Sequence, residues 1–149
     1  MPDLASWWQR LAAFVLDLAL AGLVGSVLSA AAAGPDLRST PSGGYQVVWS
    51  RGTVTAVALL VILVTAYFTF LNGSRRGQTL GKALLGIAVR DGSTYGQLGA
   101  GRALARSLTM VAFYPLLVPW VLDGVWPLWD RRHQAIHDKV AGSVVVRIR

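Results

Sequence analysis

Two residues of opposite charge, Arg10 and Asp17, lie within the first apolar stretch of the chain, residues 7–33. This stretch is long enough to cross a bilayer, because about 20 apolar residues rising about 1.5 Å each span the hydrocarbon core. A carboxylate at that depth costs roughly 2.5–3.5 kcal/mol, and acids at such positions are typical of ion pairs or of proton and cation pathways. Asp17 is therefore the first candidate for chemistry, as a titratable or cation-binding group.

The partner of Asp17 is not obvious from its own helix. Arg10 and Asp17 are seven residues apart, so they share a helical face but are separated by about 10 Å of axial rise. That is too far for easy direct pairing, and we expect a cation from another segment, Lys82, Arg102 or Arg106. A fixed ion pair that sets helix register and a proton or cation site are both open interpretations. The 102/106 pair also forms a basic ridge suited to lipid headgroups.

Two further clusters resemble known chemical motifs but lack the residues that define them. G-Q-T-L-G-K, residues 77–82, has three residues between its glycines where a phosphate loop has four, and Ala follows its lysine where Ser or Thr is needed. We expect these glycines to allow a tight turn or a close approach to a helix. Thr79 is expected to cap a short helix that ends near residue 85.

His133 and His137 are four residues apart, a spacing that suits a metal on one helical face, but no Glu follows His133 as in zinc proteases. We expect His137 and Asp138 instead to tie the basic tail to the rest of the chain. The chain has two His, no Cys and no Glu, so it offers no hydrolytic constellation. No enzymatic activity, metal or cofactor is expected.

The composition places the 149-residue chain in the membrane class, as one domain. It is 54% hydrophobic and 14% charged, against about 25% charged in soluble domains. The net charge of +7 lies beside apolar segments, which favours topology signals and anionic lipid over nucleic acid. A cleaved signal peptide is the alternative for the first stretch, but the run exceeds the usual 7–15 residues and contains Asp17.

The hydropathy pattern predicts an all-α membrane protein. Residues 11–33 and 52–71 are predicted to be full transmembrane helices, joined by an external polar loop of turns at 34–51. A third apolar region, residues 104–129, is broken by prolines and by Asp123, and we expect a hairpin that turns at 115–119.

Basic residues predict which parts of the chain face the cytoplasm. The connector at residues 72–106 is expected there by the positive-inside rule, together with the N-terminus and the tail. Residues 87–90 are predicted to form a short strand that pairs with residues 143–147. Three apolar segments make a poor pore alone, so we expect a homo-oligomer or a larger membrane complex in the lipid bilayer.

Four ordered blocks together resemble the RDD family of membrane proteins: Q-R-L-A-A-F-V-L-D, R-R-G-Q-T-L-G-K-A-L-L-G-I-A-V-R-D, G-R-A-L-A-R-S-L and R-R-H-Q-A-I-H-D-K-V-A-G-S-V-V-V. The family is named for one arginine and two aspartates, which the resemblance places at Arg10, Asp17 and Asp138. The same motifs supply a set of supporting residues: Gly77, Gln78, Gly81, Lys82, Arg102, Arg106, Arg132 and His137. The proline-rich third segment departs from the family's plainer pattern.

The resemblance implies a multi-spanning membrane protein, and some members of the family are proposed to transport ligands or to exchange sodium for protons. The leading hypothesis is therefore ion or solute transport, with Asp17 as the titratable group, Arg10 orienting it and Asp138 holding the cytoplasmic parts together. The alternative is a structural or accessory subunit of a membrane complex, with Asp17 in a fixed ion pair.

Overall fold

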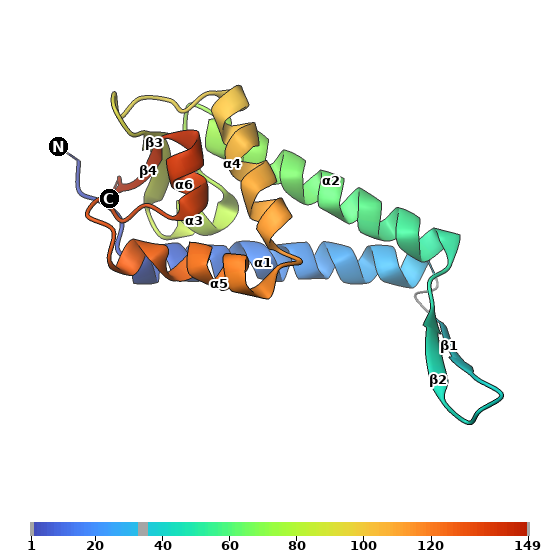
Figure 1. Cartoon of the computed structure of the whole chain (residues 1–149). Helices are drawn as coiled ribbons and strands as arrows, with labels where there is room; N and C mark the ends of the chain where they lie inside the picture. The colour runs from blue at the N-terminus through green and yellow to red at the C-terminus, as the bar shows by residue number, and fades with distance from the viewer. Residues whose placement is uncertain (1, 33–35, 149) are drawn as a thin grey trace. The chain divides into compact units, whose positions relative to one another are not determined.

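The computed structural model describes residues 2–32 and 36–148, which contacts divide into two units. The core unit comprises Met1–Leu18 and Thr65–Arg149, and the hairpin unit comprises Ala19–Val64. Each unit is described by itself. The elements, in chain order, are α1 (Trp7–Ala31), β1 (Asp36–Ser39), β2 (Tyr45–Val48), α2 (Arg51–Gly73), α3 (Leu80–Leu84), β3 (Ile87–Asp91), α4 (Ala100–Phe113), α5 (Leu117–Val125), the 3₁₀ turn η1 (Trp126–Leu128), α6 (Ile136–Ala141) and β4 (Ser143–Arg147) (Figure 1).

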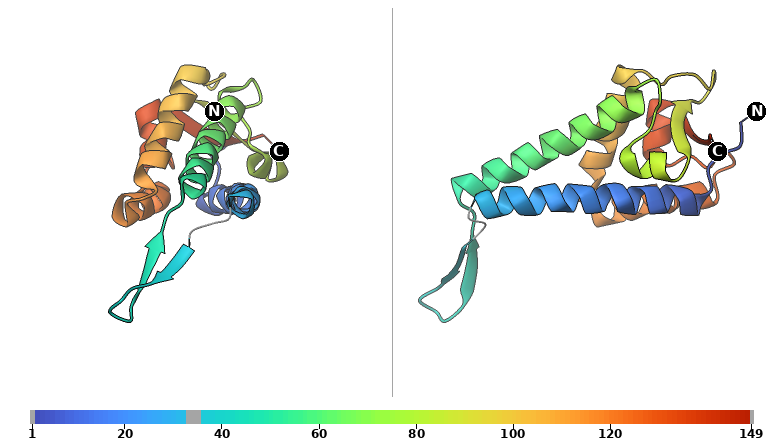
Figure 2. Two further views of the ribbon diagram at one scale, coloured as in Figure 1. Left: turned by 90° about the vertical axis from the view of Figure 1, so that its right-hand side faces the viewer. Right: turned by 180° about the vertical axis from the view of Figure 1, so that it is seen from behind.

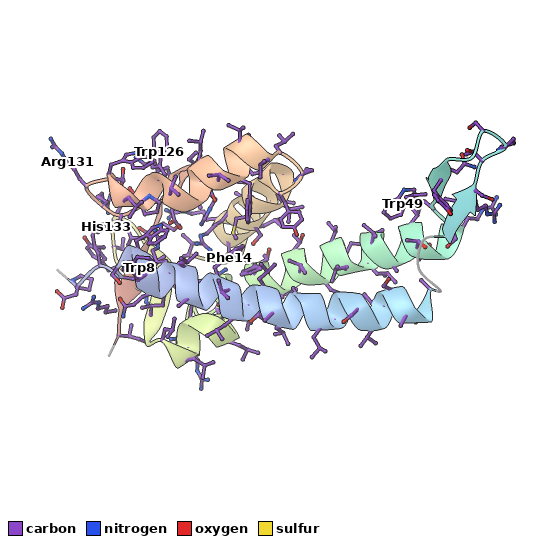
Figure 3. The ribbon with its side chains drawn as sticks, turned by 90° about the horizontal axis from the view of Figure 1, so that it is seen from below. Trp8, Phe14, Trp49, Trp126, Arg131 and His133 are labelled. Carbon is purple, nitrogen blue, oxygen red and sulfur yellow. The ribbon has the colours of Figure 1, made fainter. Side chains whose placement is uncertain are left out.

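Within the described residues, α1 and α2 are the two helices long and apolar enough to cross a membrane. They span 25 and 23 residues, in agreement with the predicted segments to within a few residues. Their large apolar side chains project outward along the helices (Figure 3), with Leu23 63% and Ile62 62% exposed. Exposing apolar surface to water costs roughly 25 cal/mol of free energy per Å². Water is therefore a poor solvent for two helices that expose so much of it. Lipid is the solvent that suits these helices.

The connection between the two long helices is a β-hairpin, so the prediction of turns without a regular element was wrong. β1 and β2 pair antiparallel, with Ser39 opposite Tyr45, and Gly43 adopts a φ of +80° in the turn between them. The Gly and Ser residues mark that turn correctly. The run Tyr45–Val48 is, however, β-branched and aromatic at three of its four positions, which favours a strand. Residues 33–35, which the prediction assigned to the first helix and the loop, lie outside the described part.

The third apolar region breaks where its first proline predicts. α4 ends at Phe113 and α5 begins at Leu117, because Pro115 cannot donate the backbone hydrogen bond that a continuous helix needs. Pro119 lies instead in the first turn of α5, where a missing N–H costs little. α5 then runs antiparallel to the start of α1. The Trp7 indole donates to the Gly124 carbonyl (2.8 Å), and the Phe14 and Trp120 rings are 6.5 Å apart.

A second small sheet joins the connector to the tail, as the sequence predicts. β3 and β4 pair antiparallel, from Ile87 opposite Arg147 to Asp91 opposite Ser143. The backbone N–H of Ala5 donates to the Val145 carbonyl (2.9 Å), so the start of the chain joins the same sheet. In the right-hand view of Figure 2, β3 lies next to α3 and α6. The fold is mostly helical, as the sequence predicts, with the expected pairing of β3 and β4 and the unexpected β1–β2 hairpin as its two small sheets.

The glycines of residues 77–82 act as the sequence analysis expects. Gly77 has a φ of +61° and turns the chain, and Thr79 caps α3 by accepting the Lys82 backbone N–H. Gly81 packs directly on α1, where a Cβ would overlap the Ala13 carbonyl oxygen and lie 3.1 Å from Asp17 Oδ1. The second glycine therefore allows α3 to approach α1 at Asp17.

Gly81→Ala is expected to destabilise the core unit by about 2 kcal/mol or more, because backbone must move to relieve the overlap. Gly101→Ala is the control, since a Cβ on that helical glycine meets nothing within 4 Å. It should raise stability by about 0.4–1 kcal/mol. Thermal unfolding in detergent measures both. Equal Tm values for the two variants would contradict the close approach.

Candidate functional site

Asp17 is 2% exposed and receives three hydrogen bonds from neutral donors. Its Oδ1 accepts from the Tyr67 hydroxyl (2.8 Å) and the Gly81 backbone N–H (2.9 Å), and its Oδ2 accepts from the Thr79 hydroxyl (2.6 Å). These donors come from α2, α3 and the cap of α3. The carboxylate thus joins three segments at one point, and the polar motif of residues 77–82 forms most of its shell.

The expectation that a cation pairs directly with Asp17 was wrong. Among the described residues, no lysine or arginine forms an ion pair with it. The close approach of Gly81 places a backbone donor at the carboxylate, and this satisfies it without the cost of desolvating a guanidinium. The connection to a cation is indirect. The Lys82 Nζ donates to Thr79 Oγ1 (3.3 Å), whose hydroxyl donates to Asp17.

Lys82 is buried, at 8% exposure, and its Nζ lies 5.6 Å from the centroid of the Phe68 ring. Burial, with a smaller contribution from the Arg106 charge, lowers the pKa of Lys82 from its ordinary 10.5 to about 7, against the opposing charges of Asp17 and Asp138. The residue one hydroxyl away from Asp17 therefore changes charge near neutral pH.

The predicted orienting role of Arg10 was also wrong, because Arg10 pairs with Asp138. Asp138 is fully buried, and Arg106 Nε donates to its Oδ1 (2.9 Å). The Ser143 hydroxyl (3.1 Å) and the Ala135 backbone N–H (3.1 Å) complete the shell. Burial would raise the pKa of Asp138, but Arg10 and Arg106 outweigh it and hold that pKa well below its usual range.

The network continues from Arg106 through His137 to Asp123. The His137 ring accepts at Nε2 from Arg106 Nη2 (2.9 Å), so its Nδ1 carries the proton and donates to Asp123 Oδ2 (2.5 Å). Burial, followed by the Arg106 charge, lowers the pKa of His137, which fits a neutral ring. Sequence reasoning missed this role of Asp123. The signal was present, since Asp123 interrupts an apolar run just as Asp17 does.

The other supporting residues hold loops and strand ends. Arg102 pairs with Asp91 and donates from Nε to the Ala141 carbonyl (2.7 Å). Gln78 donates to the Ile87 carbonyl (2.9 Å), and Arg132 to the Gly92 carbonyl. Neither Arg102 nor Arg106 forms an ion pair with Asp17, because they pair with Asp91 and Asp138.

His133 and His137 have different hydrogen-bond partners in the structure. His133 precedes α6, with a φ of +49°, and its Nδ1 lies 3.0 Å from the Pro127 carbonyl oxygen. Within residues 2–32 and 36–148, no group of three or more His, Cys, Asp or Glu side chains stands where it could hold a metal.

Some buried polar atoms in the last turns of α2 and on α4 have no hydrogen-bond partner among the described residues. They are both amide atoms of Asn72, Thr69 Oγ1 and Arg106 Nη1. Asn72 is completely buried. Each such group costs roughly 1–3 kcal/mol when unpaired, so we infer that water or a ligand satisfies them.

Asp138→Asn is expected to destabilise the protein by about 3 kcal/mol or more, because Arg10 and Arg106 would be left buried without a counter-charge. The stabilisation from Asp138 is present above about pH 4 and lost as pH falls, because the unfolded carboxyl binds a proton before the folded one does. Lys139→Gln, which removes a partly exposed ion pair, is the control and should change stability by less than about 1 kcal/mol. Thermal unfolding from pH 3 to pH 7 tests this, and equal losses in the two variants would contradict it.

Lys82→Met should remove a pH dependence of stability. Between about pH 7 and pH 10 the unfolded chain holds the Lys82 proton and the folded chain does not, so wild-type stability rises with pH across that window. The variant should be more stable at pH 7 and show a flatter rise. Lys139→Met, at an exposed position, should keep the wild-type slope. Parallel Tm curves for wild type and Lys82→Met would disprove the buried titration.

Comparison with known proteins places this geometry in a family. The family model described as "RDD family" matches residues 4–142, which include Arg10, Asp17 and Asp138. None of the curated proteins and none of the solved structures compared with the chain matches it. Because the match covers nearly the whole sequence, the chain belongs to the RDD family.

Proposed function

We propose that this RDD domain lies in a membrane through α1 and α2 and exchanges a monovalent cation for a proton at Asp17. The observation that carries the proposal is the buried Lys82, which reaches the buried Asp17 carboxylate through one hydroxyl. Two ionisable groups that share a hydroxyl beside apolar helices are suited to coupling a proton to another cation.

The exchange follows from charge balance at the pair. When Lys82 holds its proton, its charge offsets that of Asp17. When Lys82 releases the proton, the carboxylate has only neutral donors around it, and a monovalent cation replaces the lost charge. The hard oxygens at the site, from Asp17, Thr79 and Tyr67, suit a small cation such as Na⁺ once the two hydroxyls turn their lone pairs inward. One proton is thereby exchanged for one cation.

The rest of the core unit fits this role as a scaffold. The Asp138 network holds α4 and α6 to the start of α1, and the basic residues of this unit favour the cytoplasmic side of a cell membrane. The unpaired Asn72 amide and Arg106 Nη1 support a hydrated interior. Since two long helices enclose no pore alone, the exchanging assembly contains further copies or a larger membrane partner.

A structural or accessory role is the second candidate, and one observation favours it. Both oxygens of Asp17 are already satisfied by donors on α2 and α3, which makes the carboxylate a clamp between helices. In this role the domain stabilises a membrane complex and moves no ion. The loss of Asp17 would then affect folding alone.

Flux in proteoliposomes separates the two roles. With purified protein and a trapped pH-sensitive dye, a Na⁺ gradient should drive proton movement in wild type. Asp17→Asn should abolish it, and Lys82→Met should reduce it at least about tenfold. Lys139→Met is the control with the same loss of charge at an exposed site. If wild type gives no flux, and Asp17→Asn lowers only Tm and yield, the accessory role holds.

A further inference from the structure

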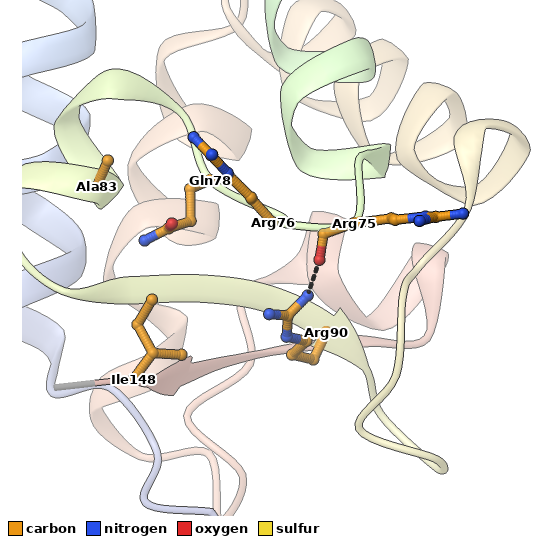
Figure 4. Close-up of a pocket in the computed structure, with 6 residues that line it drawn as sticks. All are labelled: Arg75, Arg76, Gln78, Ala83, Arg90 and Ile148. Atoms are coloured by element: carbon orange, nitrogen blue, oxygen red, sulfur yellow. Dashed lines mark hydrogen bonds between the residues drawn. The ribbon is translucent and has the colours of Figure 1, made fainter.

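A basic pocket opens on the core unit next to the end of α2. It has a volume of about 540 Å³ and is lined by Arg75, Arg76, Gln78, Ala83, Arg90 and Ile148 (Figure 4). Three of the six lining residues carry positive charge and none is acidic. Arg75 and Arg76 follow Gly73, the last residue of α2, almost directly. The pocket is therefore next to the end of a helix that has the length and apolarity of a membrane span.

The fold brings the three arginines of the pocket together from two segments of the chain. Arg90 lies on β3 and its Nη1 donates to the Arg75 backbone carbonyl (2.8 Å), which fixes one guanidinium against the loop that carries the other two. Among the described residues, the guanidinium groups of Arg75 and Arg76 form no ion pair with an acid. Figure 4 shows the Arg76 side chain on the same side as Gln78 and the Arg75 side chain pointing away from both, so Arg76 and Arg90 are the charges of the pocket itself. Like charges so close together repel one another unless an anion balances them.

The remaining lining residues narrow the chemistry of that anion. Gln78 uses its Nε2 to bind the Ile87 carbonyl, so its Oε1 is available to accept from a ligand hydroxyl. Ala83 and Ile148 supply apolar surface on the same pocket. Guanidinium groups match phosphate oxygens in geometry and charge. The alternative role of these arginines is to set membrane orientation by the positive-inside rule. That role needs basic residues on one side of the membrane, but it needs neither a pocket nor a fixed Arg90.

We propose that this pocket binds a phosphate group carried on a small hydroxylated body, as in an anionic glycerophospholipid headgroup or in a soluble phosphate ester. Arg76 contacts the phosphate, Arg90 provides a fixed second charge, Arg75 adds an exposed charge nearby, and Gln78 accepts from a hydroxyl. The place beside the end of α2 favours the lipid source, whose acyl chains would extend into the bilayer beside that helix. The proposal does not depend on ion exchange at Asp17.

Binding is measured on the full chain in a neutral detergent, by native mass spectrometry and by thermal shift. The probes are phosphatidylglycerol, phosphatidylcholine, glycerol 3-phosphate and inorganic phosphate. The double variant Arg75→Gln/Arg76→Gln is compared with Arg38→Gln/Arg131→Gln, which removes the same charge at two exposed positions outside the pocket. Both pairs are exposed, so unliganded Tm values should stay near wild type and show that the variants fold.

Wild type and the control pair should bind phosphatidylglycerol at least about tenfold more tightly than the pocket variant, and phosphatidylcholine should bind weakly to all three. This result supports a lipid phosphate site. Equally arginine-dependent binding of glycerol 3-phosphate, with no gain from acyl chains, supports a soluble phosphate ester. Equal weakening in the two double variants indicates unspecific charge attraction and overturns the proposal. The absence of binding by every probe to wild type also overturns it.

Discussion

The core unit depends on one buried carboxylate, Asp138, shared by two guanidinium groups. Arg10 comes from α1, Arg106 from α4 and Asp138 itself from α6, so a single charge cluster ties three segments that are far apart in sequence. None of the three charges is stable in that interior alone, because each would pay the cost of desolvation without a partner. The segments therefore assemble together or not at all. The neutral His137 extends the cluster to Asp123 and fixes α5 as well.

The two aspartates of the family name are buried in opposite ways. Asp138 is held by cations and stays charged across the physiological range. Asp17 is held by two hydroxyl groups and a backbone N–H, and Lys82, which contacts the same Thr79 hydroxyl, has a pKa lowered to about 7. Asp138 therefore forms a constant structural link, whereas the charge balance around Asp17 varies with pH. This contrast is the physical reason why we propose exchange at Asp17 and a structural role for Asp138.

Much of this fold could be predicted from the sequence, because it depends on local signals. Helix length, the cap at Thr79, the break at Pro115 and the pairing of two β-branched runs each follow from a few neighbouring residues. The partners of the charged groups could not be predicted. Helical spacing excludes direct pairing of Arg10 with Asp17, but it does not say which distant segment meets each charge. The neutral shell of Asp17 was missed because Tyr67 resembles an interfacial aromatic residue and a backbone N–H leaves no mark in the sequence.

The pairing of β4 with both β3 and the first residues of the chain has a consequence for biosynthesis. The ribosome makes α6 and β4 after α1 and α2. Before that point Arg10 and Arg106 lack their counter-ion, Asp138, and the edge of β3 lacks its partner strand. Nascent chains of this protein therefore pass through an incomplete stage that ends only after β4 has been made. During that interval the buried charge cluster and the sheet are open to proteolysis and to non-native pairing.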